Sequence, residues 1–166
     1  MDNLILKAIQ FATEKHRGQF RKVSNSEYIS HPIAVSYLVA SFKRSKNLDE
    51  LICACLLHDT LEDTDTDFVE LAKEFSPLTA SLVFELTSNK DQIEKMGKLE
   101  YLKVKLLGIS SYALVIKLAD RLHNISDNPT QQTIIDTKEL ILHLEKHRKL
   151  TKTHKEIIAK IKKIIK

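Results

Sequence analysis

The stretch from Leu51 to Asp63, LICACLLHDTLED, constrains the fold more than any other part of the chain. It begins as an apolar run and ends in ionisable side chains. Apolar residues recur in it at the 3.6-residue period of a helix, at Leu48, Leu51, Ile52, Cys55 and Leu56. Ala54 and Leu57 make the other side apolar as well. We therefore expect a helix that is buried nearly all round, which requires other elements to cover it.

Four ionisable residues close this stretch: His58, Asp59, Glu62 and Asp63. Burying such groups is costly unless they have partners, and a divalent cation with ordered water would provide them. On one continuous helix, residues four apart share a face, so His58 would lie beside Glu62 and Asp59 beside Asp63. The alternative is a solvated helix end with an ordinary charge cluster. We favour the metal site because the apolar run leads directly into the charges.

The length and composition predict an all-α fold. The chain has 166 residues but only three Gly and three Pro, which favours long helices over a β fold. We expect one compact helical domain over residues 1–166, with a metal-site core at about 3–127 and amphipathic helices at about 131–166. Periodicity and capping signals predict helices over about 3–17, 31–42, 48–63, 68–75, 77–86, 99–107, 112–124, 131–149 and 153–165. Residues 18–30 are expected to form a loop or short hairpin, and 89–97 a polar connection.

The sequence also predicts where the protein resides. No apolar run is long enough to span a bilayer, and the acidic, polar start is unlike a signal peptide. Cys53 and Cys55 should point to different sides of the buried helix, so we interpret them as core thiols rather than a disulfide. These features predict a cytoplasmic protein.

The positive charge is concentrated at the C-terminal end. Residues 146–166 hold nine Lys or Arg and one Glu, whereas the other residues are net acidic. An apolar stripe of Ile residues runs along the same segment, which predicts a helix that docks on the core and keeps its Lys face in water. The alternative is a surface that binds an anionic membrane or a nucleic acid.

A second polar cluster follows the apolar residues 113–116. Asp120 and Asn124 lie one helical turn apart there. Asp120 could supply a carboxylate to a metal, or it could instead pair with Lys117 or Arg121. His31 opens an earlier helix, where a helix cap or a packed core histidine is the alternative to a ligand. Taken with His58 and Asp59, these residues make two imidazoles and two carboxylates, a set that suits Mn²⁺, Fe²⁺ or Zn²⁺.

At this point the motifs resemble those of a known family. Four segments match in order: Gly18–Lys22 (GQFRK), Tyr28–Pro32 (YISHP), Leu56–Thr64 (LLHDTLEDT) and Lys117–Asn124 (KLADRLHN). The chain resembles the HD-domain metal-dependent phosphohydrolases. Within that superfamily it is similar to the alarmone hydrolase domain of the RelA/SpoT family and to small stand-alone alarmone hydrolases.

The resemblance implies an enzyme that hydrolyses guanosine 3′,5′-bis(diphosphate), ppGpp, and releases pyrophosphate from the 3′ position. It implies that one divalent ion, most often Mn²⁺ in this family, is held by His31, His58, Asp59 and Asp120. Glu62 and Asp63 would position and deprotonate the attacking water. The residues implied to contact the guanine nucleotide are Arg21, Lys22, Lys98 and Asn124. The Lys98 match is the loosest of these.

Two departures from the family pattern affect the substrate side. The loop at 23–27 lacks the usual Gly and Pro and is one residue longer, and Ser126 stands where many relatives carry Arg. They leave open the same metal chemistry on another nucleotide, such as the 2′-phosphate of NADPH or a nucleoside monophosphate. A different class also stays open, a nucleic-acid or membrane binding module that uses the basic C-terminal helix.

Overall fold

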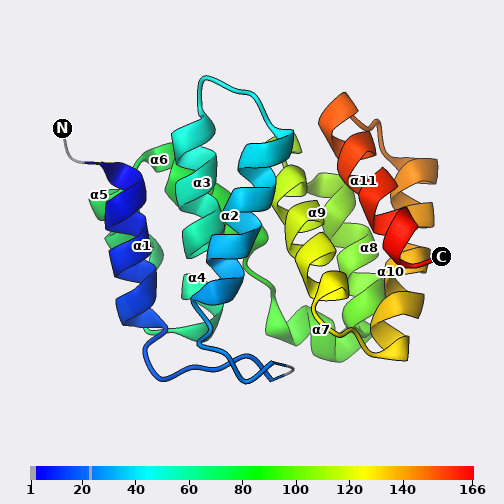
Figure 1. Cartoon of the computed structure of the whole chain (residues 1–166), viewed down its shortest axis with the longest axis horizontal. Coiled ribbons are helices and arrows are strands. Elements are labelled where there is room, and N and C mark those ends of the chain that lie inside the picture. The colour runs from blue at the N-terminus through cyan, green and yellow to red at the C-terminus, as the bar shows by residue number, and fades with distance from the viewer. Residues whose placement is uncertain (1–2, 23) are drawn as a thin grey trace. The chain divides into compact units, whose positions relative to one another are not determined.

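A computed structural model describes residues 3–22 and 24–166 (Figure 1). Within those ranges the regular structure is helical, with one isolated antiparallel bridge between Phe20 and Glu27. This confirms the predicted all-α fold. No described helix combines the length and apolar character needed to cross a membrane. The chain divides into two compact units, one ending at Thr87 and one spanning Ser88–Lys166. The single-domain organisation stays a prediction.

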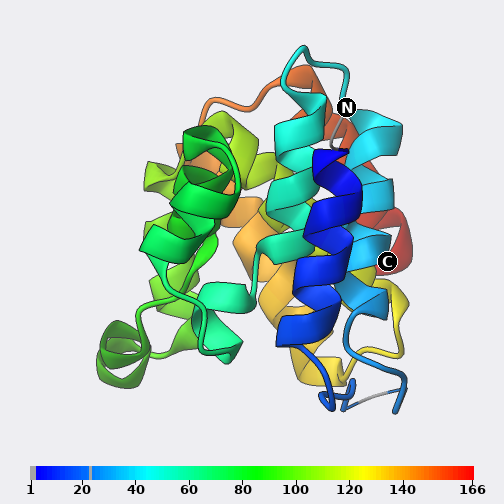
Figure 2. The same cartoon turned by 90° about the vertical axis from the view of Figure 1, so that its left-hand side faces the viewer.

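The first unit is built around α3 (Leu48–Leu57) (Figure 1). The other helices of this unit are α1 (Leu4–Lys15), α2 (Ser30–Phe42), α4 (Thr60–Asp63), α5 (Phe68–Glu74) and α6 (Pro77–Leu86). α3 packs against α1, α2 and α6, and Figure 2 shows α1 and α2 beside it. Its residues from Cys53 to Leu57 are all buried, as are Ala8 and Ala12 on α1. The expected all-round burial of this helix is therefore confirmed.

The second unit is a stack of helices in which α9 (Ser111–Ser126) packs on α11 (Lys152–Ile164). Its other helices are α7 (Lys90–Met96), α8 (Lys98–Gly108) and α10 (Gln131–His147). α10 packs on α8 and on α9, and α8 packs on α7. Ile157, Ile158 and Ile161 of α11 are buried while its lysines are exposed. The tail helix therefore docks on its own unit through the predicted apolar stripe.

Side-chain caps define several helix starts. Ser76 accepts from the Thr79 amide with Pro77 in the first turn of α6, and Ser110 accepts from the Ala113 amide at the start of α9. Both starts were expected from the sequence. Asn47 precedes α3, but its side chain makes no capping hydrogen bond. The positions of polar residues thus predict where a helix begins. They predict less reliably whether the polar side chain makes a capping hydrogen bond.

Residues 89–97 form a helix, not the expected connection. Asn89 accepts from the Gln92 amide to start α7, and Gly97, with φ 83°, lies between α7 and α8. α7 has no buried residue. Ile93 and Met96 are its only apolar residues and are too few to form an apolar stripe, so hydrophobic periodicity could not indicate this helix.

The two cysteines lie in α3 as buried free thiols. Burial raises the pKa of Cys53 to about 11, with a smaller contribution from nearby Asp49 and Glu50. Because the thiolate is the reactive form, we expect the native protein to leave both cysteines unmodified by a thiol reagent at pH 8. Titration in denaturant should then reveal both. Rapid modification of Cys53 in the native state would contradict this burial.

Candidate metal centre

The predicted helix through His58 to Asp63 is interrupted at His58 and Asp59. α3 ends at Leu57, the two residues form a turn, and the single-turn helix α4 begins at Thr60. The expectation of one continuous helix through these residues is therefore wrong. Backbone bonds connect the turn to α4, because the Asp59 carbonyl accepts from the Glu62 and Asp63 amides at 3.1 and 2.9 Å.

Side chains explain the end of α3. The last carbonyls of a helix lack intrahelical donors and need other partners. The His58 Nδ1 atom lies 2.7 Å from the Cys55 carbonyl oxygen, and the Thr60 hydroxyl donates to the Leu57 carbonyl at 2.7 Å. Both residues thus terminate the helix with their side chains. The imidazole of His58 is thereby fixed at the point where the chain turns.

His31, His58 and Asp59 form a cluster in the first unit. The two imidazole centroids lie 5.3 Å apart, and each ring offers a ligand atom within 4.8 Å of the other. Asp59 Oδ2 lies 3.0 Å from His58 Nε2 and 4.0 Å from His31 Nε2. His31 is 2% exposed and His58 1%, so both rings are held inside the protein. His31 lies in the first turn of α2.

These donors fit a divalent transition-metal ion. The bond from His58 Nδ1–H to the Cys55 carbonyl leaves the Nε2 lone pair of the neutral ring on the side of Asp59. Metal-binding histidines commonly have this backbone bond on the other nitrogen, since it fixes the tautomer and the ring orientation. Two imidazole nitrogens and a carboxylate oxygen suit Zn²⁺, Mn²⁺ or Fe²⁺. The cluster is thus a candidate metal centre.

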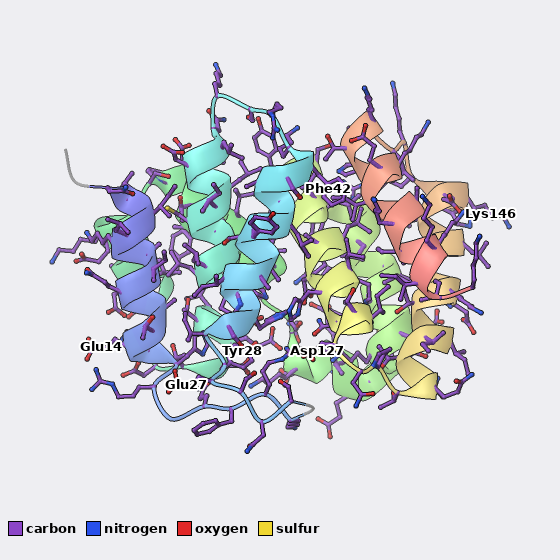
Figure 3. All side chains as sticks on the ribbon, viewed as in Figure 1. Glu14, Glu27, Tyr28, Phe42, Asp127 and Lys146 are labelled. Atoms are coloured by element: carbon purple, nitrogen blue, oxygen red, sulfur yellow. The ribbon has the colours of Figure 1, made fainter. Side chains whose placement is uncertain are left out.

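Tyr28 belongs to the same cluster, although no role was predicted for it from the sequence. Its hydroxyl donates to Asp59 Oδ2, and its ring lies 5.8 Å from the His31 ring. Figure 3 shows Tyr28 and Glu27 where the loop meets α2. Tyr28 precedes His31 by three residues in a matched motif, and that position was the only sequence signal. The bond itself could not be predicted, because Asp59 is 31 residues away in sequence.

The predicted water-activating residues follow directly after this cluster. Glu62 is half-buried and Asp63 is exposed, both in α4. The Asp63 carbonyl accepts from the Gln19 side-chain amide at 2.9 Å. α4 is therefore held from two sides, by the Asp59 carbonyl and by Gln19.

In the second unit, α9 brings Asp120 and Asn124 together. The Asn124 amide donates to Asp120 Oδ1 at 2.6 Å, and Lys117 Nζ lies 3.0 Å from Asp120 Oδ2. The ion pair with Lys117 that the sequence offered as an alternative is present. Asp120 is buried, 8% exposed, so its carboxylate is held in a defined orientation.

The predicted substrate residues lie on different elements. Arg21 is half-buried, and its backbone forms bonds with Ser26 and Asn25 that close the loop after Gly18. Lys22 is exposed, as is Lys98 in the first turn of α8. Val23, the first residue of the atypical 23–27 loop, lies outside the described residues.

Comparison with known proteins agrees with this helical fold. A family model described as "HD domain" matches residues 8–142. The chain is 37% identical over 125 residues to the Danio rerio protein named guanosine-3′,5′-bis(diphosphate) 3′-pyrophosphohydrolase MESH1, which covers 75% of this chain and 68% of that protein. A Spiroplasma citri protein named guanosine-3′,5′-bis(diphosphate) 3′-pyrophosphohydrolase is 35% identical over 152 residues, covering 84% of this chain but 19% of its own length.

A solved structure matches nearly the whole chain. It is described as a metazoan ortholog of SpoT that hydrolyses ppGpp and has a role in starvation responses. The TM-score is 0.82 at 28% identity, covering 99% of this chain and 94% of that one. The helical fold matches that of this solved structure, and the chain belongs to the HD-domain family. Within that family it is similar to the proteins named as ppGpp 3′-pyrophosphohydrolases.

Proposed function

We propose that this protein is a metal-dependent hydrolase that releases pyrophosphate from the 3′ position of ppGpp. The observation that carries the proposal is the convergence of the buried His31 and His58 with the partly buried Asp59, within a chain whose relatives bear that activity in their names. The proposed substrate is therefore a guanine nucleotide polyphosphate, and the proposed location is the cytoplasm.

The proposed ligands of one divalent ion are His31, His58, Asp59 and Asp120. Asp120 is included because it stands in the matched Lys117–Asn124 motif and because its carboxylate is buried and oriented by Asn124. Mn²⁺ is the proposed ion. When bound, such an ion lowers the pKa of a water ligand and offsets negative charge on a phosphate.

Glu62 and Asp63 are the proposed residues that orient the attacking water and accept its proton. Both side chains are carboxylates. The backbone amides of Glu62 and Asp63 donate to the Asp59 carbonyl, so the position of both residues depends on that of a proposed ligand. A carboxylate can take a proton from the attacking water in the transition state, provided it lies within hydrogen-bond reach. Neither residue needs to hold the ion, which separates their role from that of the ligands.

Arg21, Lys22, Lys98 and Asn124 are the proposed contacts to substrate. A carboxylate-rich centre would repel a polyphosphate, so cationic side chains are needed to hold it. Arg21 is the proposed contact to the base, because a guanidinium can stack on a purine and also donate to phosphate. Asn124 would hydrogen-bond the ribose or phosphate side.

The nearest alternative is the same chemistry on NADPH or a nucleoside monophosphate. Ser126 is the reason to test this alternative. Its hydroxyl donates to the Leu122 carbonyl at 2.8 Å. A serine side chain is also too short to make the contacts of the Arg that many relatives carry at this position. A binding module that uses the basic tail is less favoured, because Ile157, Ile158 and Ile161 of α11 are buried rather than presented to a membrane.

The direct test is a nucleotide panel incubated with Mn²⁺-loaded protein, with the products separated and identified. Pyrophosphate and a guanosine 5′-diphosphate from ppGpp would support the proposal. Turnover of NADPH but not ppGpp would favour the alternative. Retention on RNA or anionic lipid that weakens with salt, with no metal-dependent turnover, would favour the binding module.

Substitutions at Arg21 and Lys22 test how the substrate is selected. Arg21→Lys should raise KM for ppGpp more than for NADPH, since Lys keeps the charge but cannot stack on guanine or donate in two directions. Lys22→Ala should weaken both substrates alike, because an exposed lysine supplies only a point charge. The measurement is kcat and KM on both substrates. Equal losses on both for Arg21→Lys would reject a base-reading role.

A further inference from the structure

His16, Gln19 and Tyr28 form a connected group beside the metal cluster that the proposed mechanism does not use. His16 is 3% exposed although it follows directly after α1. Its Nδ1 lies 2.8 Å from Gln19 Oε1, and its ring centroid lies 4.7 Å from that of Tyr28. A buried histidine that is neither a proposed ligand nor in the apolar core needs another explanation.

The hydrogen bonds of this group can be assigned from their chemistry. The Asp63 carbonyl can only accept, so the Gln19 amide nitrogen must face it and the Gln19 oxygen must face His16. His16 Nδ1 therefore carries the hydrogen and donates. Among the described residues, His16 Nε2 is buried without a hydrogen-bond partner. The ring is thus held by Gln19 and by a tilted contact with the Tyr28 ring.

Two arms extend from His16 to the site. One runs through the Tyr28 ring, whose hydroxyl donates to Asp59 Oδ2. The other runs through Gln19 to the Asp63 carbonyl at the end of α4. The first arm reaches a proposed ligand, and the second reaches the turn that carries the proposed water-activating carboxylates.

We infer that His16, Gln19 and Tyr28 are positioning residues that orient Asp59 for the metal and fix α4 relative to it. The inference rests on the proposed metal site. Hydrogen-bond partners of a metal-binding carboxylate restrict its rotation, and losing one typically weakens metal affinity about 10- to 100-fold. Of the three, Tyr28 acts on the ligand directly, while Gln19 acts on the backbone of α4.

The test compares two identical chemical changes. Tyr28→Phe removes the hydroxyl that donates to Asp59 but keeps the ring that contacts His16. Tyr101→Phe is the matched control: Tyr28 is half-buried and Tyr101 is 5% exposed, and the Tyr101 hydroxyl accepts from the Asn89 amide at 2.8 Å in the second unit. Mn²⁺ affinity is measured by isothermal titration of the whole protein without nucleotide, and kcat and KM are measured separately.

We expect Tyr28→Phe to weaken Mn²⁺ binding about tenfold and Tyr101→Phe to leave it unchanged. Gln19→Met, which breaks the arm to α4, should lower kcat with little change in Mn²⁺ affinity. Gln19→Glu keeps an acceptor for His16 but cannot donate to Asp63, so it should not restore kcat.

The experiment distinguishes failure of the positioning role from failure of the proposed metal site. Parent-like Mn²⁺ affinity in Tyr28→Phe, with binding intact in the parent, would overturn the positioning role and leave the proposed function standing. If Tyr101→Phe weakened Mn²⁺ binding as much as Tyr28→Phe does, general destabilisation would explain the effect and the inference would be overturned. A parent that binds no Mn²⁺ would overturn the metal site and this inference together.

Discussion

Replacing Glu62 by Gln is expected to lower kcat on ppGpp by about 10²- to 10⁴-fold while the protein still binds Mn²⁺. Gln has nearly the same shape as Glu but cannot accept a proton. The half-buried Glu62 lies in α4, after the proposed ligands, so its substitution should leave the His31–His58–Asp59 cluster in place. Loss of kcat with KM and Mn²⁺ affinity retained is the pattern of an interaction made only in the transition state.

Single-turnover kinetics and Mn²⁺ titration on the same preparation provide the measurement. Glu94→Gln is the matched control, because Glu94 is an exposed glutamate in the separate helix α7. Parallel kinetics of Asp63→Asn would show whether the neighbouring carboxylate shares the role. A fully active Glu62→Gln enzyme would place the base elsewhere.

Replacing His58 by Ala should remove bound metal and activity together. The imidazole is 1% exposed, and it is both a proposed ligand and the group that bonds the Cys55 carbonyl, so the variant is also expected to be less stable without metal. The informative quantity is therefore the rise in Tm on adding Mn²⁺. A ligand at 100 times its Kd stabilises the folded state by about 2.7 kcal/mol, and this increment should vanish.

His154→Ala is the control for that experiment. His154 is also fully buried, and it caps α11 and bonds the Ser111 carbonyl within the second unit. Its loss should lower Tm but preserve the Mn²⁺-dependent increment. Metal content after gel filtration gives an independent reading. Stoichiometric metal retained by His58→Ala would remove His58 from the ligand set.

The elements predicted from sequence are those with an apolar face. α3 was predicted from its helical period, and the tail helix α11 from its Ile stripe, because burial of apolar surface is the main driving force for folding. α7 was missed because it buries no side chain. The end of α3 was missed because bonds from His58 and Thr60 to backbone carbonyls decide it, and these bonds have no period.

The residues of the candidate site also divide into those that the sequence predicts and those that it does not. His58 and Asp59 could be proposed as ligands because they directly follow a buried run in the sequence. Tyr28 and His16 could not be connected to them from residues alone. Their contacts join α1, the following loop and the turn after α3, and only tertiary packing brings these segments together.

The placement of His58 and Asp59 at the end of α3 has a consequence for how the protein loses function. α3 is the helix that α1, α2 and α6 cover, so its amides should exchange with solvent only when the first unit opens as a whole. A site on a peripheral loop could disorder while the fold survives. Here the imidazole and carboxylate cannot disorder without exposing Cys53 and Leu56, so thermal inactivation should coincide with loss of helix rather than precede it.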